Sequence, residues 1–185
     1  YRPGAVARLK GAIKDGQTVL LDGQIASQSA DFQFMSRIGG PAEGEDKVLV
    51  DGAVDQPYAI PNYRFRGYLA EMAIPVGLWR SVGYSVNGFV HDTFVDEMAH
   101  KAKADPLEFR YRLIKDRHAP SATTLETVRQ MSEWTAKTPE GVGMGVGVTY
   151  SFGTPVAIVI RVEDQDGVIH MTNAWIACDV GLAVD

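Results

Sequence analysis

The residues best placed to do chemistry in this 185-residue chain are a tryptophan and an arginine in one short loop. Proline and glycine break the loop, and a long apolar-periodic segment follows it directly. The loop ends in five candidates for a binding site: Trp79, Arg80, Ser81, Val82 and Gly83. Backbone N–H groups and a fixed guanidinium at a helix start favour an anionic ligand. The alternative is that Arg80 is a helix-start arginine paired with a nearby carboxylate.

A second pattern is a strict alternation of four glycines: Gly141, Gly143, Gly145 and Gly147. Their spacing differs from the GxGxxG of dinucleotide-binding loops, and no helix is expected after them. Alternate glycines leave one face of a strand bare, so that another backbone or a cofactor can approach closely. We favour tight packing over a cofactor role.

Three further patterns indicate structure rather than catalysis, and no metal site is predicted. The acidic run Glu163–Gly167 lacks the ligand positions of a calcium loop and predicts a turn. The four histidines lack the spacing of zinc ligands, so each is expected to be structural or exposed. Cys178 lies in an apolar strand and is expected to be a small core residue.

Composition excludes several classes of function. The net charge is −5 and the 18 Lys and Arg residues are scattered, which disfavours a nucleic-acid-binding surface. No apolar run approaches the ~18–20 residues of a membrane span. The single cysteine allows neither an internal disulfide nor the ligand set of an iron–sulfur cluster.

Upstream of the arginine-containing loop, the sequence predicts a hairpin, an irregular segment and a strand. The hairpin turns at Asp15-Gly16, because Asp-Gly is a strong turn signal between alternating strands. The expected ranges are strands over 5–13 and 18–26, a loop over 29–57 centred on Gly39–Asp46, and a strand over 63–72.

Downstream, periodicity predicts helices and then strands. The first helix buries a stripe made of Val86, Phe89, Val90, Phe94, Val95 and Met98. Asp105 and Thr123 are expected to cap the next two helices. The expected ranges are helices over 84–103, 106–115 and 124–134, then strands over 144–150, 156–163 and 168–176, with a turn at Asp166-Gly167.

This order predicts an α+β fold, a mixed sheet of hairpins with helices packed on one side. We place a domain boundary after residue 138. Residues 1–138 hold the hairpin, the arginine-containing loop and the helices, and residues 139–185 begin a strand-rich segment.

The loop resembles the cofactor loop of molybdenum-binding large subunits of the xanthine dehydrogenase and aldehyde oxidase superfamily. Its Trp-Arg-Ser-Val-Gly form is closest to isoquinoline 1-oxidoreductase beta subunits and membrane-associated aldehyde dehydrogenases. Five further strings occur in the family's order: Tyr1–Pro3, Tyr58–Asn62, Asp105–Arg110, Ser151–Thr154 and Cys178–Gly181. The purine-oxidising branch has Gly-Phe where this chain has Ser81-Val82, so its substrate preference is not carried over.

The resemblance implies a fragment of a molybdopterin-dependent oxidoreductase that hydroxylates aldehydes or N-heterocycles with water. It implies that Trp79–Gly83 bind the molybdenum cofactor, and that an iron–sulfur subunit and a cytochrome c accept the electrons. The family's glutamate base lies in a Gly-Glu motif that has no match here, so the catalytic base is unassigned. The isolated chain is expected to lack molybdenum and activity.

The resemblance also implies a periplasmic or membrane-associated location, with the cytoplasm as the alternative. Any targeting signal is expected to lie outside this fragment. The rival hypothesis is a non-catalytic structural or subunit-interaction domain. A buried Arg80 fixed beside an anion pocket would favour the enzyme. An Arg80 held in a local salt bridge would favour the rival.

Overall fold

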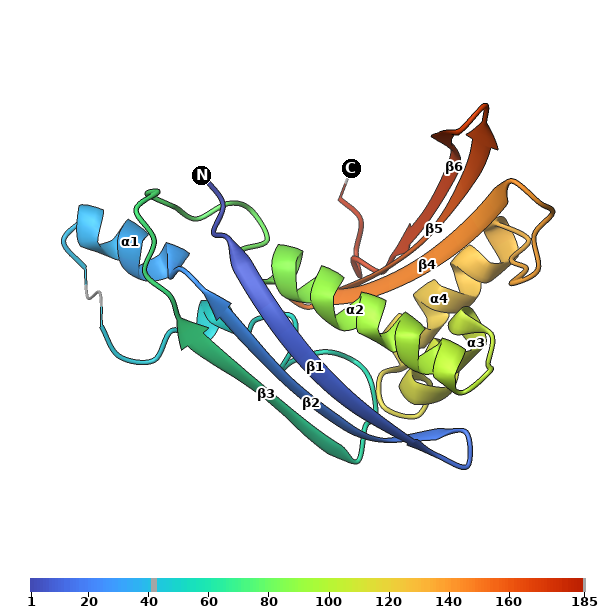
Figure 1. Cartoon of the computed structure of the whole chain (residues 1–185), viewed down its shortest axis with the longest axis horizontal. Coiled ribbons are helices and arrows are strands. Elements are labelled where there is room, and N and C mark those ends of the chain that lie inside the picture. Colours follow the sequence, from blue (N-terminus) through green and yellow to red (C-terminus); the bar gives the residue numbers. More distant parts are fainter. Residues whose placement is uncertain (41–42, 185) are drawn as a thin grey trace. The chain divides into compact units, whose positions relative to one another are not determined.

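The computed structural model describes residues 1–40 and 43–184, which fold into two compact units (Figure 1). Unit 1 comprises Tyr1–Gln56 and Ile60–Phe94, and unit 2 comprises Pro57–Ala59 and the chain from Val95 onward. Each unit contains a three-stranded sheet together with helices. The predicted α+β class is confirmed, and the domain boundary after residue 138 remains a prediction.

The sheet of unit 1 is mixed and has the order β1-β2-β3: β1 (Ala5–Lys14), β2 (Gln17–Ser27) and β3 (Asn62–Leu69). The predicted hairpin is confirmed, and its turn residues Asp15 and Gly16 have φ of 50° and 73°. β3 runs parallel to β2. One face of this sheet is buried around Ile25, Phe65 and Ala53.

The loop predicted over 29–57 is wrong, because helix α1 (Ala30–Arg37) and the 3₁₀ turn η1 (Lys47–Leu49) lie within it. The Ser29 Oγ accepts a hydrogen bond from Phe32 N at 2.8 Å, and the Asp46 carboxylate likewise accepts from Val48 N at 3.0 Å. These N-caps satisfy backbone donors that a short helix would otherwise leave unpaired. Residues 41 and 42, in the predicted loop centre, lie outside the described residues.

Helix α2 (Tyr84–Lys101) was predicted over 84–103, but its buried face differs from the predicted stripe. Phe89 is 70% exposed, whereas Asn87 and His91 are buried at 1% and 2%. Asn87, His91 and Val95 follow one another at i+4 spacing, so they share one face of the helix. Apolar periodicity missed them because their side chains are polar.

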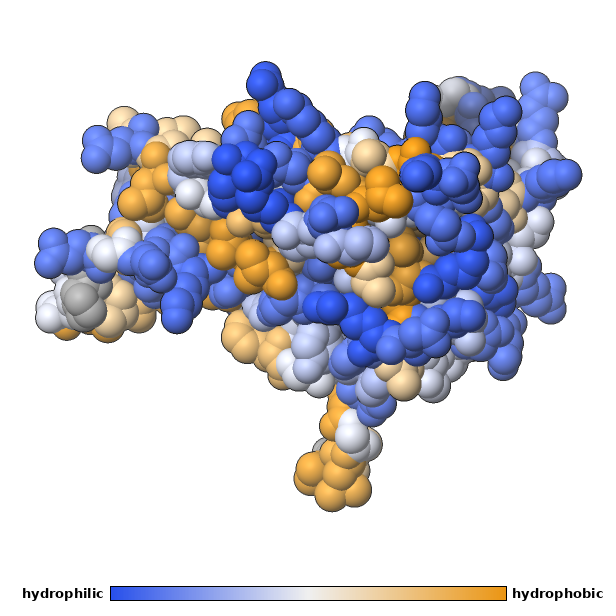
Figure 2. All heavy atoms as spheres, turned by 90° about the horizontal axis from the view of Figure 1, so that it is seen from below, coloured by the Kyte–Doolittle hydropathy of each residue, from blue (hydrophilic) through white to orange (hydrophobic). Residues whose placement is uncertain are grey.

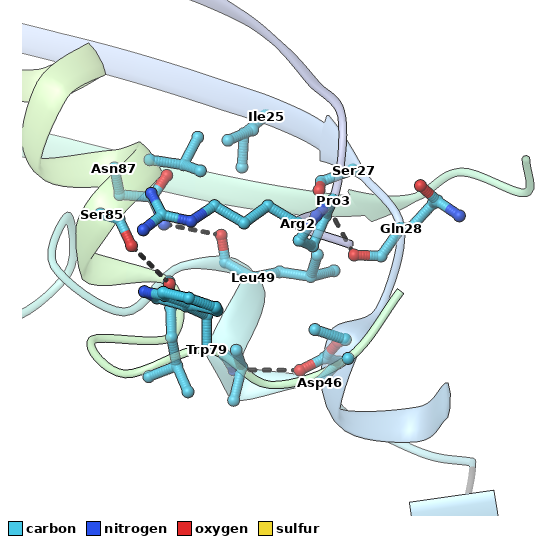
Figure 3. Close-up of a pocket in the computed structure, with 16 residues that line it drawn as sticks. Arg2, Pro3, Ile25, Ser27, Gln28, Asp46, Leu49, Trp79, Ser85 and Asn87 are labelled. Atoms are coloured by element: carbon cyan, nitrogen blue, oxygen red, sulfur yellow. Dashed lines mark hydrogen bonds between the residues drawn. The ribbon is translucent and has the colours of Figure 1, made fainter. Parts of the chain in front are cut away.

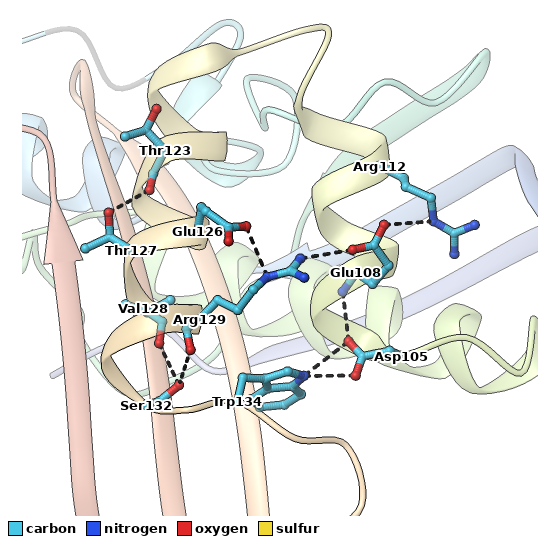
Figure 4. Close-up of polar contacts among 10 residues, drawn as sticks. All are labelled: Asp105, Glu108, Arg112, Thr123, Glu126, Thr127, Val128, Arg129, Ser132 and Trp134. Atoms are coloured by element: carbon cyan, nitrogen blue, oxygen red, sulfur yellow. Dashed lines mark hydrogen bonds and ion pairs between the residues drawn. The ribbon is translucent and has the colours of Figure 1, made fainter.

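Unit 2 continues with α3 (Pro106–Ile114) and α4 (Ala119–Met131). Asp105 caps α3 as predicted, since its Oδ1 accepts from Glu108 N at 2.8 Å. The predicted start of α4 is wrong: His118 is the N-cap, and Pro120 lies in the first turn, where its missing N–H costs nothing. Figure 4 shows Arg129 of α4 paired with Glu108 of α3, which joins the two helices, and with Glu126 of its own helix.

The sheet of unit 2 is an antiparallel meander of β4 (Val142–Ser151), β5 (Thr154–Gln165) and β6 (Val168–Cys178), as predicted. The turn at Asp166-Gly167 is also confirmed, because Asp164 Oδ1 accepts from Gly167 N at 2.7 Å. α4 packs against all three strands, and Val146, Val148, Ala157 and Val159 are buried.

Hydrophilic residues cover most of the face seen in Figure 2, with apolar patches between them. Among the described residues, no helix combines the length and the apolar character that crossing a membrane would require.

Candidate functional site

The segment from Ala70 to Gly83, here called the arginine loop, is held mainly through its backbone. Gln28 Nε2 donates to Ile74 O at 2.7 Å. Val76, only 1% exposed, has its N–H bound by Gln33 Oε1 at 2.8 Å and its carbonyl bound by the Arg37 guanidinium. Side chains from the end of β2 and from α1 therefore satisfy backbone groups that no strand pairs.

The arginine loop ends in a strained turn. Ser81 and Val82 have φ of 78° and 38°, and a β-branched residue at positive φ is a rare conformation that costs about 1–3 kcal/mol. Val82 N donates to Trp79 O at 2.9 Å, and Tyr84 N donates to Ser81 O at 2.8 Å. These N–H groups are used within the turn, so the sequence-based expectation that loop amides face a ligand does not hold for them.

Gly83 allows the start of α2 to lie directly on η1. A Cβ at this position would lie 2.0 Å from Val48 O, a distance that no side chain tolerates. Asn87, one turn later, donates through Nδ2 to Leu49 O at 2.8 Å and to Asp51 O at 2.9 Å. The segment predicted to be an irregular loop thus supports the turn that carries Trp79 and Arg80.

A cleft of about 40 Å³ opens between the arginine loop, η1 and the end of β2. Figure 3 shows Arg2 reaching across this cleft toward Asn87, and its guanidinium carbon lies 5.1 Å from the centre of the Trp79 ring. That separation permits a cation–π contact, which anchors the chain's N-terminal segment to the loop. The cleft walls are largely apolar and include Ile25 and Leu49.

Two polar atoms at this cleft are buried without a hydrogen-bond partner among the described residues, Asn87 Oδ1 and Asp46 Oδ2. A buried acceptor left unpaired costs about 1–3 kcal/mol. Such acceptors favour a bound group that carries N–H or O–H donors, or an ordered water.

Asp51, which lies against the turn of the arginine loop at Gly83, is close to other acidic residues. Burial raises the pKa of the Asp51 carboxyl above its ordinary value, and the charges of Asp55, Asp46 and Asp31 raise it further. Gly83 approaches this residue closely, because a Cβ there would lie 3.1 Å from Asp51 Cβ. Burial therefore disfavours the charged form of Asp51 at the point where the turn lies against it.

The structure brings together part of the predicted site. Trp79, Val82 and Gly83 line the cleft, and Ser81 Oγ lies 2.7 Å from Ser85 Oγ. Arg80 is exposed, does not line the cleft, and has no hydrogen bond or ion pair to another described residue. The sequence analysis missed Arg2 and Asn87. A polar residue at i+4 from the loop's last glycine was the available signal for Asn87.

The other predicted sites have simpler roles. Gly143 packs tightly, since a Cβ would lie 3.1 Å from Val162 Cγ2, but a Cβ at Gly145 would meet no atom within 4 Å. Tight packing is therefore wrong for Gly145. Cys178 is exposed, so its predicted core role is also wrong. It lies on the sheet face opposite α4, which apolar composition alone could not distinguish. Among the described residues, no cluster of His, Cys, Asp and Glu could hold a metal ion.

Comparison with known proteins identifies a family for the segment that contains this site. Residues 20–114 match the family model of the molybdopterin cofactor-binding domain, which is just over half of the chain and includes the arginine loop. A curated relative is the isoquinoline 1-oxidoreductase subunit beta of Brevundimonas diminuta, 27% identical over 130 residues. That alignment covers 68% of this chain and 16% of the relative.

Two solved structures share the fold. The aldehyde oxidoreductase from Desulfovibrio gigas matches 92% of this chain with a TM-score of 0.55 and 18% identity. The aldehyde oxidoreductase from Desulfovibrio desulfuricans ATCC 27774 matches 93% with a TM-score of 0.55 and 16% identity. This chain covers 21% of each of those chains.

Proposed function

Because the chain belongs to the family of the molybdopterin cofactor-binding domain, we propose that its arginine loop forms part of the cofactor site of an oxidoreductase. The match agrees with the resemblance drawn from Trp79–Gly83 and the five other strings. The observation that carries the proposal is the way the loop is held. Its backbone is fixed by Gln28, Gln33 and Arg37, while Trp79 and Arg80 remain exposed. Arg80 meets neither criterion given in the sequence analysis, since it is not buried beside the cleft and forms no salt bridge among the described residues.

The residues at the loop fit an anionic cofactor with a planar, donor-bearing ring system. Arg2, whose guanidinium carbon lies 5.1 Å from the centre of the Trp79 ring, and Arg80, the residue after Trp79, supply positive charge, and the Trp79 indole is 62% exposed. The unpaired Asn87 Oδ1 can accept a hydrogen bond from a ring N–H. An arginine suits this role because its planar fork binds two acceptor atoms at once.

When bound, a molybdenum cofactor supplies two-electron oxidation and a water-derived oxygen, which gives hydroxylation of an aldehyde or an N-heterocycle. The described residues bind and orient. Arg80 offers charge and a bidentate fork, Trp79 offers a flat apolar surface, and Gly83 with Asn87 keeps the turn in place. No catalytic base is assigned to this chain.

The chain spans between 16% and 21% of the length of the relatives it matches, so the activity of a whole protein is part of the proposal. The curated relative is a subunit of an oxidoreductase, which supports assembly with another subunit. We propose an iron–sulfur subunit as that partner and cytochrome c as an electron acceptor. A periplasmic or membrane-associated location is proposed from the resemblance alone.

Arg80→Lys in the full-length enzyme tests the role of the loop. The substitution retains the charge but removes the fork, so we expect activity to fall at least about tenfold, which corresponds to about 1.4 kcal/mol. Molybdenum content should fall with activity or stay unchanged, and the melting temperature should move little. Arg117→Lys, at another exposed arginine, is the matched control.

Wild-type turnover in Arg80→Lys, or a large loss of thermal stability with normal specific activity, would return Arg80 to a structural role. Molybdenum analysis and dye reduction on the same full-length preparation test the rival hypothesis of a non-catalytic domain. If the full-length protein carries no molybdenum and reduces no dye with aldehydes or N-heterocycles, the rival is correct. The isolated chain should show neither metal nor turnover, because it covers only part of such an enzyme.

A further inference from the structure

The face of the unit 1 sheet that points away from its core carries four basic residues in two adjacent rows. The register aligns Arg8 with Gln24 and Gln24 with Arg66. In the next row Lys10 aligns with Asp22 and Asp22 with Arg64. Successive residues of a strand point to opposite faces, so these six lie on the face opposite Ile25 and Phe65 in the core. We call this set the basic face: Arg8, Lys10, Asp22, Gln24, Arg64 and Arg66.

Asp22 orders the two arginines of β3. Its carboxylate accepts from Arg64 Nε at 3.0 Å and from Arg64 Nη2 at 2.6 Å, and Arg66 Nη2 lies 3.3 Å from Oδ1. The hydrogen bonds from Arg64 lower the pKa of Asp22, and the charges of Arg66 and Lys10 add to this effect. The carboxylate is thus ionised at neutral pH, and the remaining guanidinium donors are available to another molecule.

The cations on β1 are not neutralised in this way. Within residues 1–40 and 43–184, neither Arg8 nor Lys10 forms an ion pair. Together with Asp22, Gln24 and Arg66 they line a hollow of about 70 Å³. The basic face therefore carries four positive charges and one negative charge.

Protection of sheet edges is the simplest alternative explanation, because charged residues on edge strands prevent unwanted pairing. Both β1 and β3 are edge strands of this sheet. Lysine is the residue most used for such protection, however, and three of the four cations on this face are arginines. Four basic residues on one face of a chain with net charge −5 suit an acidic partner.

We propose that the basic face binds an extended acidic segment of a partner polypeptide. Arg8 and Lys10 are two residues apart on β1, which places their Cα atoms about 6.7 Å apart. Alternate residues of an extended partner segment have the same spacing, so successive carboxylates can meet successive cations. Each row extends across three strands, roughly 10 Å.

A single multivalent oxyanion fits this face less well. Asp22 lies at the middle of its row, where it would repel a phosphate placed between the cations. Carboxylates separated along a polypeptide avoid that position and reach the cations of β1 and β3. The proposal concerns a surface other than the arginine loop and does not depend on the cofactor.

A fluorescence anisotropy titration tests this inference with the 185-residue chain and a fluorescein-labelled peptide of alternating glutamate and glycine. The test variant is Arg8→Gln/Lys10→Gln. The control is Lys115→Gln/Arg117→Gln, which removes the same two charges at the same spacing from exposed positions of unit 2. We expect saturable binding at low salt, weakened about fivefold by the test variant and unchanged within about twofold by the control.

Three results would overturn the proposal: no binding at low salt, equal weakening by both double variants, or equal binding of a lysine–glycine peptide. A single-stranded DNA oligonucleotide and phosphatidylserine vesicles are titrated in parallel. Tighter binding of either one, lost in Arg8→Gln/Lys10→Gln, would mean that the face recognises nucleic acid or a lipid surface instead. Circular dichroism of every variant must match wild type, so that a loss of binding is not a loss of folding.

Discussion

The arginine loop of unit 1 and the helices α3 and α4 of unit 2 both depend on arginines, but they use them in opposite ways. At the arginine loop, Arg37 of α1 binds the backbone carbonyl of Val76, and Arg80 is left exposed without a partner among the described residues. In unit 2, Arg110 is completely buried, and its Nη1 lies 2.5 Å from Asp96 Oδ1. Arg129 binds two carboxylates, as Figure 4 shows.

The difference separates structural arginines from binding arginines without reference to their sequence motifs. Both Arg80 and Arg110 belong to strings that resemble the family, Trp79–Gly83 and Asp105–Arg110. Of these two strings, only Trp79–Gly83 leaves the guanidinium of its arginine available to bind a ligand. In a binding loop, we expect a backbone fixed by hydrogen bonds and an arginine side chain without a partner. In a protein core, we expect an arginine side chain that is paired and buried.

The largest expected effect is on the buried arginine. Arg110→Gln leaves Asp96 without its partner and opens space in a packed region, so we expect a loss of about 3 kcal/mol in the free energy of unfolding. Arg80→Gln should change it by less than about 0.5 kcal/mol, because nothing described depends on that side chain. Urea denaturation of both variants measures the comparison. Equal losses would remove the distinction between the two arginines.

A smaller effect is expected where the turn of the arginine loop lies on η1. Gly83→Ala places a Cβ against Val48 O and should cost about 1–3 kcal/mol. Gly145→Ala is the matched control, since its Cβ would meet nothing within 4 Å, and alanine there should stabilise by up to about 1 kcal/mol. If thermal unfolding shows the two substitutions to be equivalent, the close approach at Gly83 does not exist in solution.

The smallest effect is the pH dependence that comes from Asp51. Its raised pKa means that the folded chain holds the proton more tightly than the unfolded chain. Stability therefore falls as the pH rises from the ordinary value of 3.8 through the raised pKa. Asp51→Asn should raise the melting temperature by about 1–3 °C at pH 7 and leave it unchanged below pH 3.8. Glu140→Gln, at an exposed position, is the control for the loss of one carboxylate.

The sequence predicted most of the secondary structure because turns and caps are local. Asp15-Gly16 and Asp166-Gly167 set their hairpins, and Asp105 set the start of α3. α1 was missed because a run rich in Gly, Asp, Glu and Pro obscured the cap at Ser29. The early start of α4 was missed because histidine is an uncommon N-cap.

The site was only partly predictable, because its supports are distant in the sequence. The arginine loop is identifiable from Trp79–Gly83 alone. Gln33 Oε1 accepts a hydrogen bond from the N–H of Val76, which is 43 positions away in the sequence. Asn87 Nδ2 donates to Leu49 O, which is 38 positions away. No periodicity encodes such pairs. The exposure of Arg80 also depends on which carboxylates the fold brings near, and the sequence does not contain that information.

The parallel pairing of β2 with β3 has a consequence for the order in which the chain folds. Leu20 pairs with Asn62, so the chain between them must close before the sheet of unit 1 is complete. The sheet of unit 2 needs only two short turns, because its strands are consecutive and antiparallel. Sheets with distant pairing form more slowly than local ones, since loop closure costs entropy before any contact compensates it. In pulsed hydrogen exchange during refolding, the amides of β4 and β5 should therefore gain protection before those of β3, and the reverse order would contradict this expectation.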